Sequence, residues 1–313
     1  MKEEKHSSYR DSLKSMDTEE HIDLIFYRPI GYAWACLARK LHVTPNAITI
    51  ASIILGIAAG VLFYFPVMWI NIIGMVLLVW ANSFDSADGQ LARMTHQYSR
   101  IGRILDGMAG DLWFITIYLA IIFRVNATSA FFSQHLWLMW VIGVVTGICH
   151  AKQAAMADYY RQFHLYFLYG KEGSELDSAA MLKERLAELS WKKNFWQKIT
   201  LFFYTNYTVN QESMTPAMQA LRRELRQRFP GDTPIPESFR EDFRKASLPL
   251  MKYTNILSFN WRTIALFCSL FACMPWLYFA FELTVLNALL VYMMIRHERI
   301  CRRLTKALQE GRY

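Results

Sequence analysis

The chain has 313 residues, of which 54% are hydrophobic and only 19% are charged. Soluble domains are about 45–50% apolar on a comparable count, so this composition favours a membrane protein with separate polar segments. The net charge of +8 fits anionic lipid and an anionic substrate better than nucleic acid, given the apolar runs, and five cysteines without a CxxC spacing exclude a disulfide or zinc framework.

The first segments of the chain are polar and then amphipathic. Residues 1–20 predict a polar N-terminal tail without a cleavable signal peptide. Residues 21–42 mix aromatic residues with Arg28, Arg39 and Lys40, which predicts a helix lying in the membrane interface. The alternative is an ordinary amphipathic core helix.

Six apolar segments follow, each a candidate for a transmembrane helix of about 20 residues. The fifth is short and ends at Pro275, which leaves only a tight turn before the sixth. Together they predict an all-α integral membrane protein with six transmembrane helices, preceded by the interfacial helix. The segments are 46–65, 67–84, 105–123, 136–155, 261–274 and 276–295.

Basic residues are concentrated on one side of this topology. The links predicted on the other side carry essentially one cation, Arg124. The positive-inside rule therefore places both termini and the aspartate-containing segment in the cytoplasm, and we expect a bacterial inner (cytoplasmic) membrane. Residues 157–260 are too long for a simple connection, and their helical spacing predicts a helical, basic cytoplasmic insertion between helices 4 and 5, lying partly on the membrane. The expected division is 1–20, 21–156, 157–260 and 261–313.

Four aspartates, Asp85, Asp88, Asp106 and Asp111, lie between two apolar runs. Each charge at bilayer depth costs about 2.5–3.5 kcal/mol on insertion scales, so four unpaired carboxylates would be expensive. Hard divalent cations such as Mg²⁺ or Mn²⁺ prefer carboxylate oxygens and would neutralise them. The alternative is that one or two of these groups are ordinary helix-end charges that reach the cytoplasmic surface.

The spacing around the first two aspartates predicts a diphosphate site. Asp85 and Asp88 share a helical face because they are three residues apart. Gly89 and Ala92 leave the adjacent helix surface free of large side chains, so a ligand can approach the backbone closely. The planar guanidinium of Arg93 suits a phosphate. Two metal ions bridging a diphosphate would stabilise a leaving phosphate.

The run DSADGQLAR, followed by MTHQYSRI, Gly102 and then Asp106, resembles the CDP-alcohol phosphotransferase signature D-x2-D-G-x2-A-R-x8-G-x3-D-x3-D. The resemblance covers residues 20–160. It implies six transmembrane helices, a cytosolic active site, a homodimer, and transfer of a phosphate-linked group from a CDP-alcohol to an acceptor hydroxyl with release of CMP. By residue match, Asp85, Asp88 and Asp106 would bind metal. Gly89, Ala92 and Gly102 would make room for the nucleotide, and Arg93 would contact the diphosphate.

The sequence departs from this signature at the last aspartate, the residue that the family uses as the usual candidate for the catalytic base. The expected position is Gly110, whereas Asp111 comes one residue later. Five residues turn an ideal helix by about 500°, roughly 140° from the Asp106 face. A π-bulge at Gly107 and Gly110 would restore the alignment and make Asp111 a metal ligand and the base. The alternative is that Asp111 is no ligand and the base is missing or replaced.

Four further polar residues are candidates for contacts to phosphate or to the acceptor. Arg100 and Arg103 flank Gly102 and could touch phosphate or anchor the cytosolic turn. His150 and Lys152 could line an acceptor pocket or be polar helix-end residues.

The predicted activity is metal-dependent transfer from a CDP-alcohol, most readily CDP-diacylglycerol, in phospholipid biosynthesis. An alternative is headgroup transfer to a lipid acceptor such as diacylglycerol or ceramide, including phosphoinositol transfer to make a phosphosphingolipid. An intramembrane prenyltransferase also uses aspartate-rich diphosphate sites, but the DGxxAR continuation argues against it. A cation pathway is disfavoured because Glu282 is the only carboxylate in the other four predicted spans.

Overall fold

The computed structural model describes residues 17–170, 177–192, 194–230 and 233–313, and these contain helices and connecting turns but no strand. The chain forms two compact units. The first comprises the chain up to His150 together with Phe259–Val285, and the second comprises Ala151–Ser258 together with Leu286–Tyr313. The prediction of an all-α membrane protein is confirmed.

The first unit begins with a π-helical turn, Asp23–Tyr27, which continues into helix α1, Arg28–Lys40. A glycine allows α1 to pack closely on α3. A Cβ atom at Gly31 would lie 2.8 Å from the Ser86 hydroxyl oxygen. The helix predicted for residues 21–42 therefore exists, and its location in the membrane interface stays a prediction.

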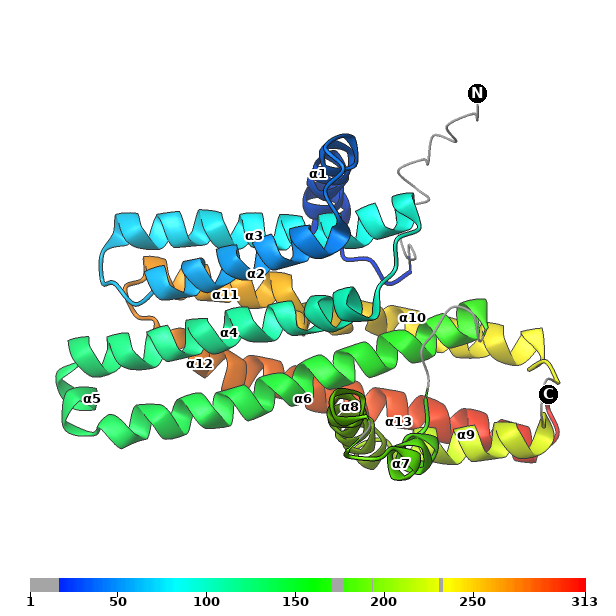
Figure 1. Cartoon of the computed structure of the whole chain (residues 1–313). Helices are drawn as coiled ribbons and strands as arrows, with labels where there is room; N and C mark the ends of the chain where they lie inside the picture. Colours follow the sequence, from blue (N-terminus) through cyan, green and yellow to red (C-terminus); the bar gives the residue numbers. More distant parts are fainter. Residues whose placement is uncertain (1–16, 171–176, 193, 231–232) are drawn as a thin grey trace. The chain divides into compact units, whose positions relative to one another are not determined.

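Helices α2 (Pro45–Leu62), α3 (Met68–Thr95) and α4 (Arg100–Thr128) form the core of the first unit (Figure 1). The Thr44 hydroxyl caps the start of α2, and proline occupies its first position, where no backbone N–H is needed. A Cβ atom at Gly56 would lie 2.1 Å from the Trp113 ring, so α2 and α4 approach as closely as small residues permit.

The remaining helices of the first unit are α5 (Ala130–Gln134), α11 (Phe259–Phe271), α12 (Trp276–Phe281) and a π-helical turn, Glu282–Leu286, with the start of α6 (Leu136–Tyr169). Buried Arg262 on α11 forms an ion pair with buried Glu282. The Glu282 carboxylate also accepts a 2.7 Å hydrogen bond from Tyr278. His150 Nδ1 lies 2.7 Å from the Tyr118 hydroxyl and 3.0 Å from Arg262 Nη1, so one polar network joins α4, α6, α11 and the π-turn.

Five helical segments in the described part of the chain are long and apolar enough to cross a membrane. The predicted fifth span corresponds to α11, whose 13 residues reach only about 20 Å, against about 30 Å for the hydrocarbon core. The predicted count of six is therefore not confirmed. The five candidates are Pro45–Leu62, Met68–Thr95, Leu105–Thr128, Leu136–Tyr169 and Trp276–Gln309.

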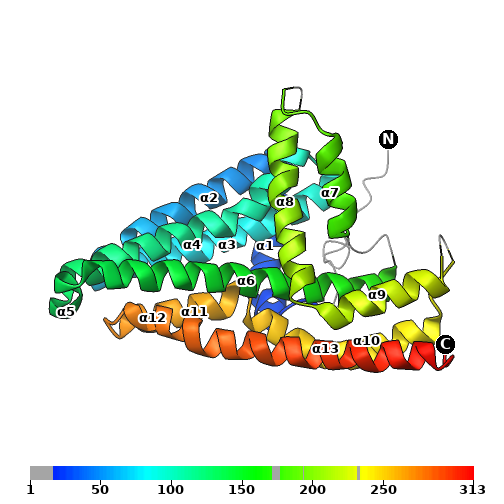
Figure 2. The ribbon, with the colours of Figure 1, turned by 90° about the horizontal axis from the view of Figure 1, so that it is seen from below.

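The second unit contains helices α7 (Ala179–Glu188), α8 (Phe195–Ser213), α9 (Pro216–Arg228), α10 (Glu237–Ile256) and α13 (Asn287–Gln309), with the end of α6. Helix α7 packs against α8, and α9 runs along α13 (Figure 2). The predicted helical character of the insertion is correct. The fourth helix, however, continues to Tyr169 rather than ending at residue 155, and the apolar pattern of residues 179–199 is divided between α7 and α8.

Candidate active site

The turn between α3 and α4 brings the aspartates of the two helices together. Helix α3 ends at His96, whose left-handed backbone (φ 54°) reverses the chain. The Ser99 hydroxyl then accepts a 2.8 Å hydrogen bond from the Gly102 N–H and starts α4. Asp85 and Asp88 lie one turn apart on α3, and Asp106 lies in the second turn of α4.

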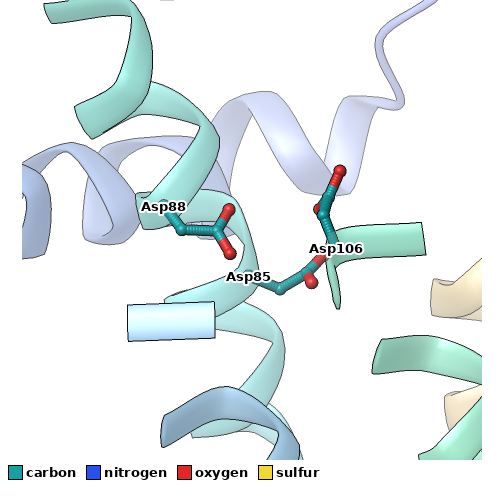
Figure 3. A group of neighbouring side chains, drawn as sticks. All are labelled: Asp85, Asp88 and Asp106. Atoms are coloured by element: carbon teal, nitrogen blue, oxygen red, sulfur yellow. The ribbon is translucent and has the colours of Figure 1, made fainter. Parts of the chain in front are cut away.

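Each of these three aspartates offers a carboxylate oxygen within 4.8 Å of the other two (Figure 3). Their environments differ, because Asp88 is buried, Asp85 is half-buried and Asp106 is exposed. Thr49 on α2 donates a 2.5 Å hydrogen bond to Asp88 Oδ2. A cluster of hard oxygen donors with this spacing fits a divalent metal, and these residues are three of the four predicted ligands.

Asp111 is not part of this cluster, and the predicted π-bulge is wrong. Helix α4 is an uninterrupted α-helix from Arg100 to Thr128. A Cβ atom at Gly107 or Gly110 would meet nothing within 4 Å. No close contact at these two glycines therefore favours a π-bulge. Asp111 is exposed, on a helical segment apolar enough to cross a membrane.

A cleft of about 220 Å³ surrounds the three aspartates. Gly89 and Arg93 line it, as the signature implied. A Cβ atom at Gly89 would lie 3.5 Å from Arg93 Nη1, so the glycine leaves space beside the guanidinium. The lining residues are Asp23, Tyr27, Arg28, Asn82, Asp85, Ser86, Asp88, Gly89, Arg93 and Asp106.

The two other small residues of the motif are placed differently. A Cβ atom at Gly102 would lie 2.3 Å from Asn46 Oδ1, so this glycine allows α4 to pack against the start of α2. The space beside it is filled by Asn46 rather than left open for a nucleotide. Ala92 is half-buried and does not line the cleft.

The segment before α2 contributes a second cation that the sequence motif did not indicate. Arg28 Nε donates a 3.0 Å hydrogen bond to Glu19, and Nη1 lies 3.4 Å from the Ser86 hydroxyl. Gln90 on α3 donates a 3.1 Å hydrogen bond to the Arg28 carbonyl. Arg28 is thus fixed against α3 at the edge of the cleft. Its only signal in the sequence was its position in an aromatic and basic segment.

Tyr27 is a further lining residue that sequence reasoning missed. Its side chain is buried, and this burial raises the pKa of the hydroxyl above its ordinary value, against the opposing effect of a hydrogen bond with Asn82. The hydroxyl is therefore protonated at neutral pH and can act as a hydrogen-bond donor in the cleft.

The other predicted contact residues do not meet in this cleft. His150 belongs to the polar network with Tyr118 and Arg262. Lys152 is exposed on α6, in the second unit. The side chains of Arg100 and Arg103 lie outside the described part of the structure.

The fold and the site define a helical membrane protein whose acidic cluster, beside two arginines, can bind a divalent metal. Residues 42–164 match the family model described as CDP-alcohol phosphatidyltransferase. This segment is similar to the CDP-alcohol phosphotransferase family, whose members transfer phosphate-linked groups between alcohols and generally depend on divalent metals. Comparisons with curated proteins and with solved structures gave no match.

Proposed function

We propose that this protein transfers a phosphate-linked group from a CDP-alcohol, most readily CDP-diacylglycerol, to the hydroxyl of an acceptor, with release of CMP. One observation supports it above all: three carboxylates and two arginines line the same cleft of about 220 Å³. Acidic groups that can hold metal next to cations that can bind phosphate are what a diphosphate donor requires.

Asp85, Asp88 and Asp106 would hold Mg²⁺ or Mn²⁺, two ions being expected from the family resemblance. A divalent cation bound there would neutralise the negative charge of the diphosphate. Arg93 and Arg28 contribute fixed positive charge and planar donors that can contact phosphate oxygens from two directions, one from α3 and the other from the segment before α2.

The difference in exposure among the aspartates suggests how the two substrates divide the cleft. Asp88 is held in the interior by Thr49, which fixes the orientation of one carboxylate. Asp106 faces solvent, so the acceptor hydroxyl would approach from the Asp106 side. The acceptor oxygen would form a bond to the phosphorus that carries the alcohol, and the bond from that phosphorus to the oxygen of CMP would break, with its electron pair leaving on CMP. The proton of the acceptor hydroxyl would be released to solvent on the exposed, Asp106 side of the cleft.

The predicted base needs a separate test. In a regular α-helix Asp111 points roughly 140° away from the Asp106 face, so the geometry no longer supports it as a ligand of the same metals. The cytoplasmic location of the site and both termini, the inner membrane and the homodimer stay predictions.

The decisive experiment uses purified full-length protein with Mg²⁺ or Mn²⁺ and measures CMP release. One arm combines CDP-diacylglycerol with a panel of small alcohols, including inositol phosphate, glycerol phosphate and serine. A second arm combines CDP-linked headgroups with diacylglycerol or ceramide. We expect metal-dependent CMP release in the first arm, and none from an Asp85→Asn control. Release confined to the second arm would reverse the assignment of donor and acceptor, and a lack of metal-dependent release in both would reject a CDP-alcohol donor.

A further inference from the structure

Helix α8 in the second unit has the reverse of the usual polarity of a helix in a soluble domain. Its side chains that face the interior of the unit include Thr205, Thr208 and Gln211, all buried. Its exposed side chains are mostly aromatic, and Trp196 is 78% exposed and Phe203 67% exposed. The exposed aromatic residues of α8 are Phe195, Trp196, Phe202, Phe203 and Tyr207.

The two sides follow from helical spacing. At about 100° per residue, Phe195, Trp196, Phe202 and Phe203 fall within about 120° of one another, and Thr208 falls on the opposite side. We name the stripe formed by Phe195, Trp196, Phe202 and Phe203 the aromatic face of α8. A group of exposed aromatic side chains of this kind marks an interaction site, since it would be unfavourable in water. The exposed Asn206 lies among them and donates a 2.9 Å hydrogen bond to the Phe202 carbonyl.

The polar side of α8 already has its partners within the second unit. Gln211 donates a 2.8 Å hydrogen bond to the Ala155 carbonyl of α6. Thr205 and Thr208 donate to carbonyls one turn earlier on α8 itself. Tyr207, beside this stripe, donates a 3.4 Å hydrogen bond to Asp158 of α6. Helix α8 is therefore attached through its polar side and Tyr207, and the aromatic face is the side left for a partner.

Cations lie at the beginning of the aromatic face. The sequence WKKNFWQK, residues 191–198, alternates aromatic residues with lysines. Lys192 is exposed, and Lys198 Nζ lies 5.0 Å from the centre of the Trp191 ring. Aromatic side chains together with lysines are typical of helices that lie in the boundary between headgroups and acyl chains, where the cations meet anionic lipid.

We propose that α8 lies flat on an anionic membrane surface with its aromatic face buried among the lipids. The 19 residues of α8 are not among the five segments apolar enough to cross the bilayer, which fits a helix that lies on the membrane instead. The same unit holds parts of two segments that are long and apolar enough to cross a membrane, which is consistent with a bilayer close to α8.

A second copy of the chain is the competing occupant. The aromatic face carries no acidic side chain, so a second copy packed against it through the same face would offer Lys192 and Lys198 no counter-charge from that face. Anionic headgroups supply that missing negative charge. Charge complementarity therefore favours lipid.

The test is site-specific photo-crosslinking of the full chain in nanodiscs that contain phosphatidylcholine and phosphatidylglycerol. Benzoylphenylalanine is placed at Trp196 or Phe203 on the aromatic face. The matched control is Gln197, which is also exposed on α8 but points away from the aromatic face. Mass spectrometry identifies whether the adduct is lipid or protein.

We expect lipid adducts at positions 196 and 203 that exceed those at position 197 several-fold. Adducts of twice the protein mass at 196 and 203 would overturn the proposal in favour of a second copy. Lipid adducts no more frequent than at position 197 would overturn it as well, because the aromatic face would then lie away from the bilayer. CMP release is not part of this readout, so the result is independent of the proposed transfer reaction.

Discussion

Thr49 on α2 donates a hydrogen bond to the buried carboxylate of Asp88 on α3. The sequence motif does not connect these two helices. Because Asp88 is only 3% exposed, this hydroxyl is a principal determinant of the orientation of the carboxylate. The acidic cluster is thus held by a neighbour 39 residues earlier in the chain.

Replacing Thr49 tests this relationship. Thr49→Val keeps the shape but leaves a buried acceptor without its donor, which costs about 1–3 kcal/mol. We expect transfer to fall by about tenfold at fixed metal concentration, since 1.4 kcal/mol corresponds to a factor of ten, and the metal requirement to rise. CMP release measured over a Mg²⁺ titration checks it. Thr49→Ser should recover most of the activity, and equal losses in both variants would argue against the hydrogen bond.

Asp85→Asn removes one charge from the cluster without changing its size. Because the three carboxylates would share the binding of the metal, we expect transfer to drop to the rate without enzyme. The variant should elute like the unmodified protein in detergent, which serves as the folding control. Unchanged CMP release from a folded Asp85→Asn protein would remove the cluster from the mechanism.

Asp111→Asn should be much milder. Asp111 is exposed and lies on a regular helix, turned away from Asp106, so the exchange should cost no more than about 0.5 kcal/mol, as for most exposed positions. We expect CMP release to stay within about threefold of the unmodified protein. Steady-state rates at saturating donor measure this. A collapse comparable with that of Asp85→Asn would show that Asp111 takes part in the reaction after all.

Arg28→Gln tests the contribution of the segment before α2. Loss of a charged hydrogen-bonding group costs about 1.5–3 kcal/mol, so we expect kcat/KM for the CDP-alcohol to fall about tenfold or more. Arg39→Gln is the matched control, because Arg39 is an exposed cation at the other end of α1. Equal effects of the two substitutions would assign Arg28 to general membrane binding rather than to the cleft.

Glu282→Leu tests the buried ion pair with Arg262. Removing one partner leaves an uncompensated buried charge and should lower the free energy of unfolding by about 3–5 kcal/mol. Thermal unfolding in detergent measures the loss. Thr284→Val, an exposed change on the same π-turn, is the control, and the double variant Arg262→Leu/Glu282→Leu should regain much of the stability. A single variant as stable as the parent would mean that the pair carries little energy.

The elements that the sequence predicted well are those with a strong local signal. Asp85, Asp88 and Asp106 could be grouped because helical spacing and the motif fix which residues share a face, and the structure brings them together. The same is true of α2, whose start is marked by Thr44 and Pro45. Local patterns of this kind predict the structure correctly because they do not depend on packing between residues far apart in the chain.

The failures have a different origin. The end of α6 and the division between α7 and α8 depend on what packs against them. Arg28 is held in the cleft by contacts with Glu19, Ser86 and Gln90. The bulge was inferred from the shifted last aspartate of the signature and from the apolar helix around Asp111, whereas α4 is a regular α-helix through this residue. Long-range contact and exposure are properties of the folded chain that spacing alone does not contain.

The position of Arg28 shows that the residues that line the cleft are not confined to the segment that matches the family. The segment that matches the family begins at residue 42, and Arg28 lies upstream of it while lining the same cleft as the motif aspartates. A protein that keeps every motif residue can therefore exchange one of the two cations that line the cleft by changing α1 alone. On the proposed function, preference for a donor could change through this helix while the three aspartates stay as they are.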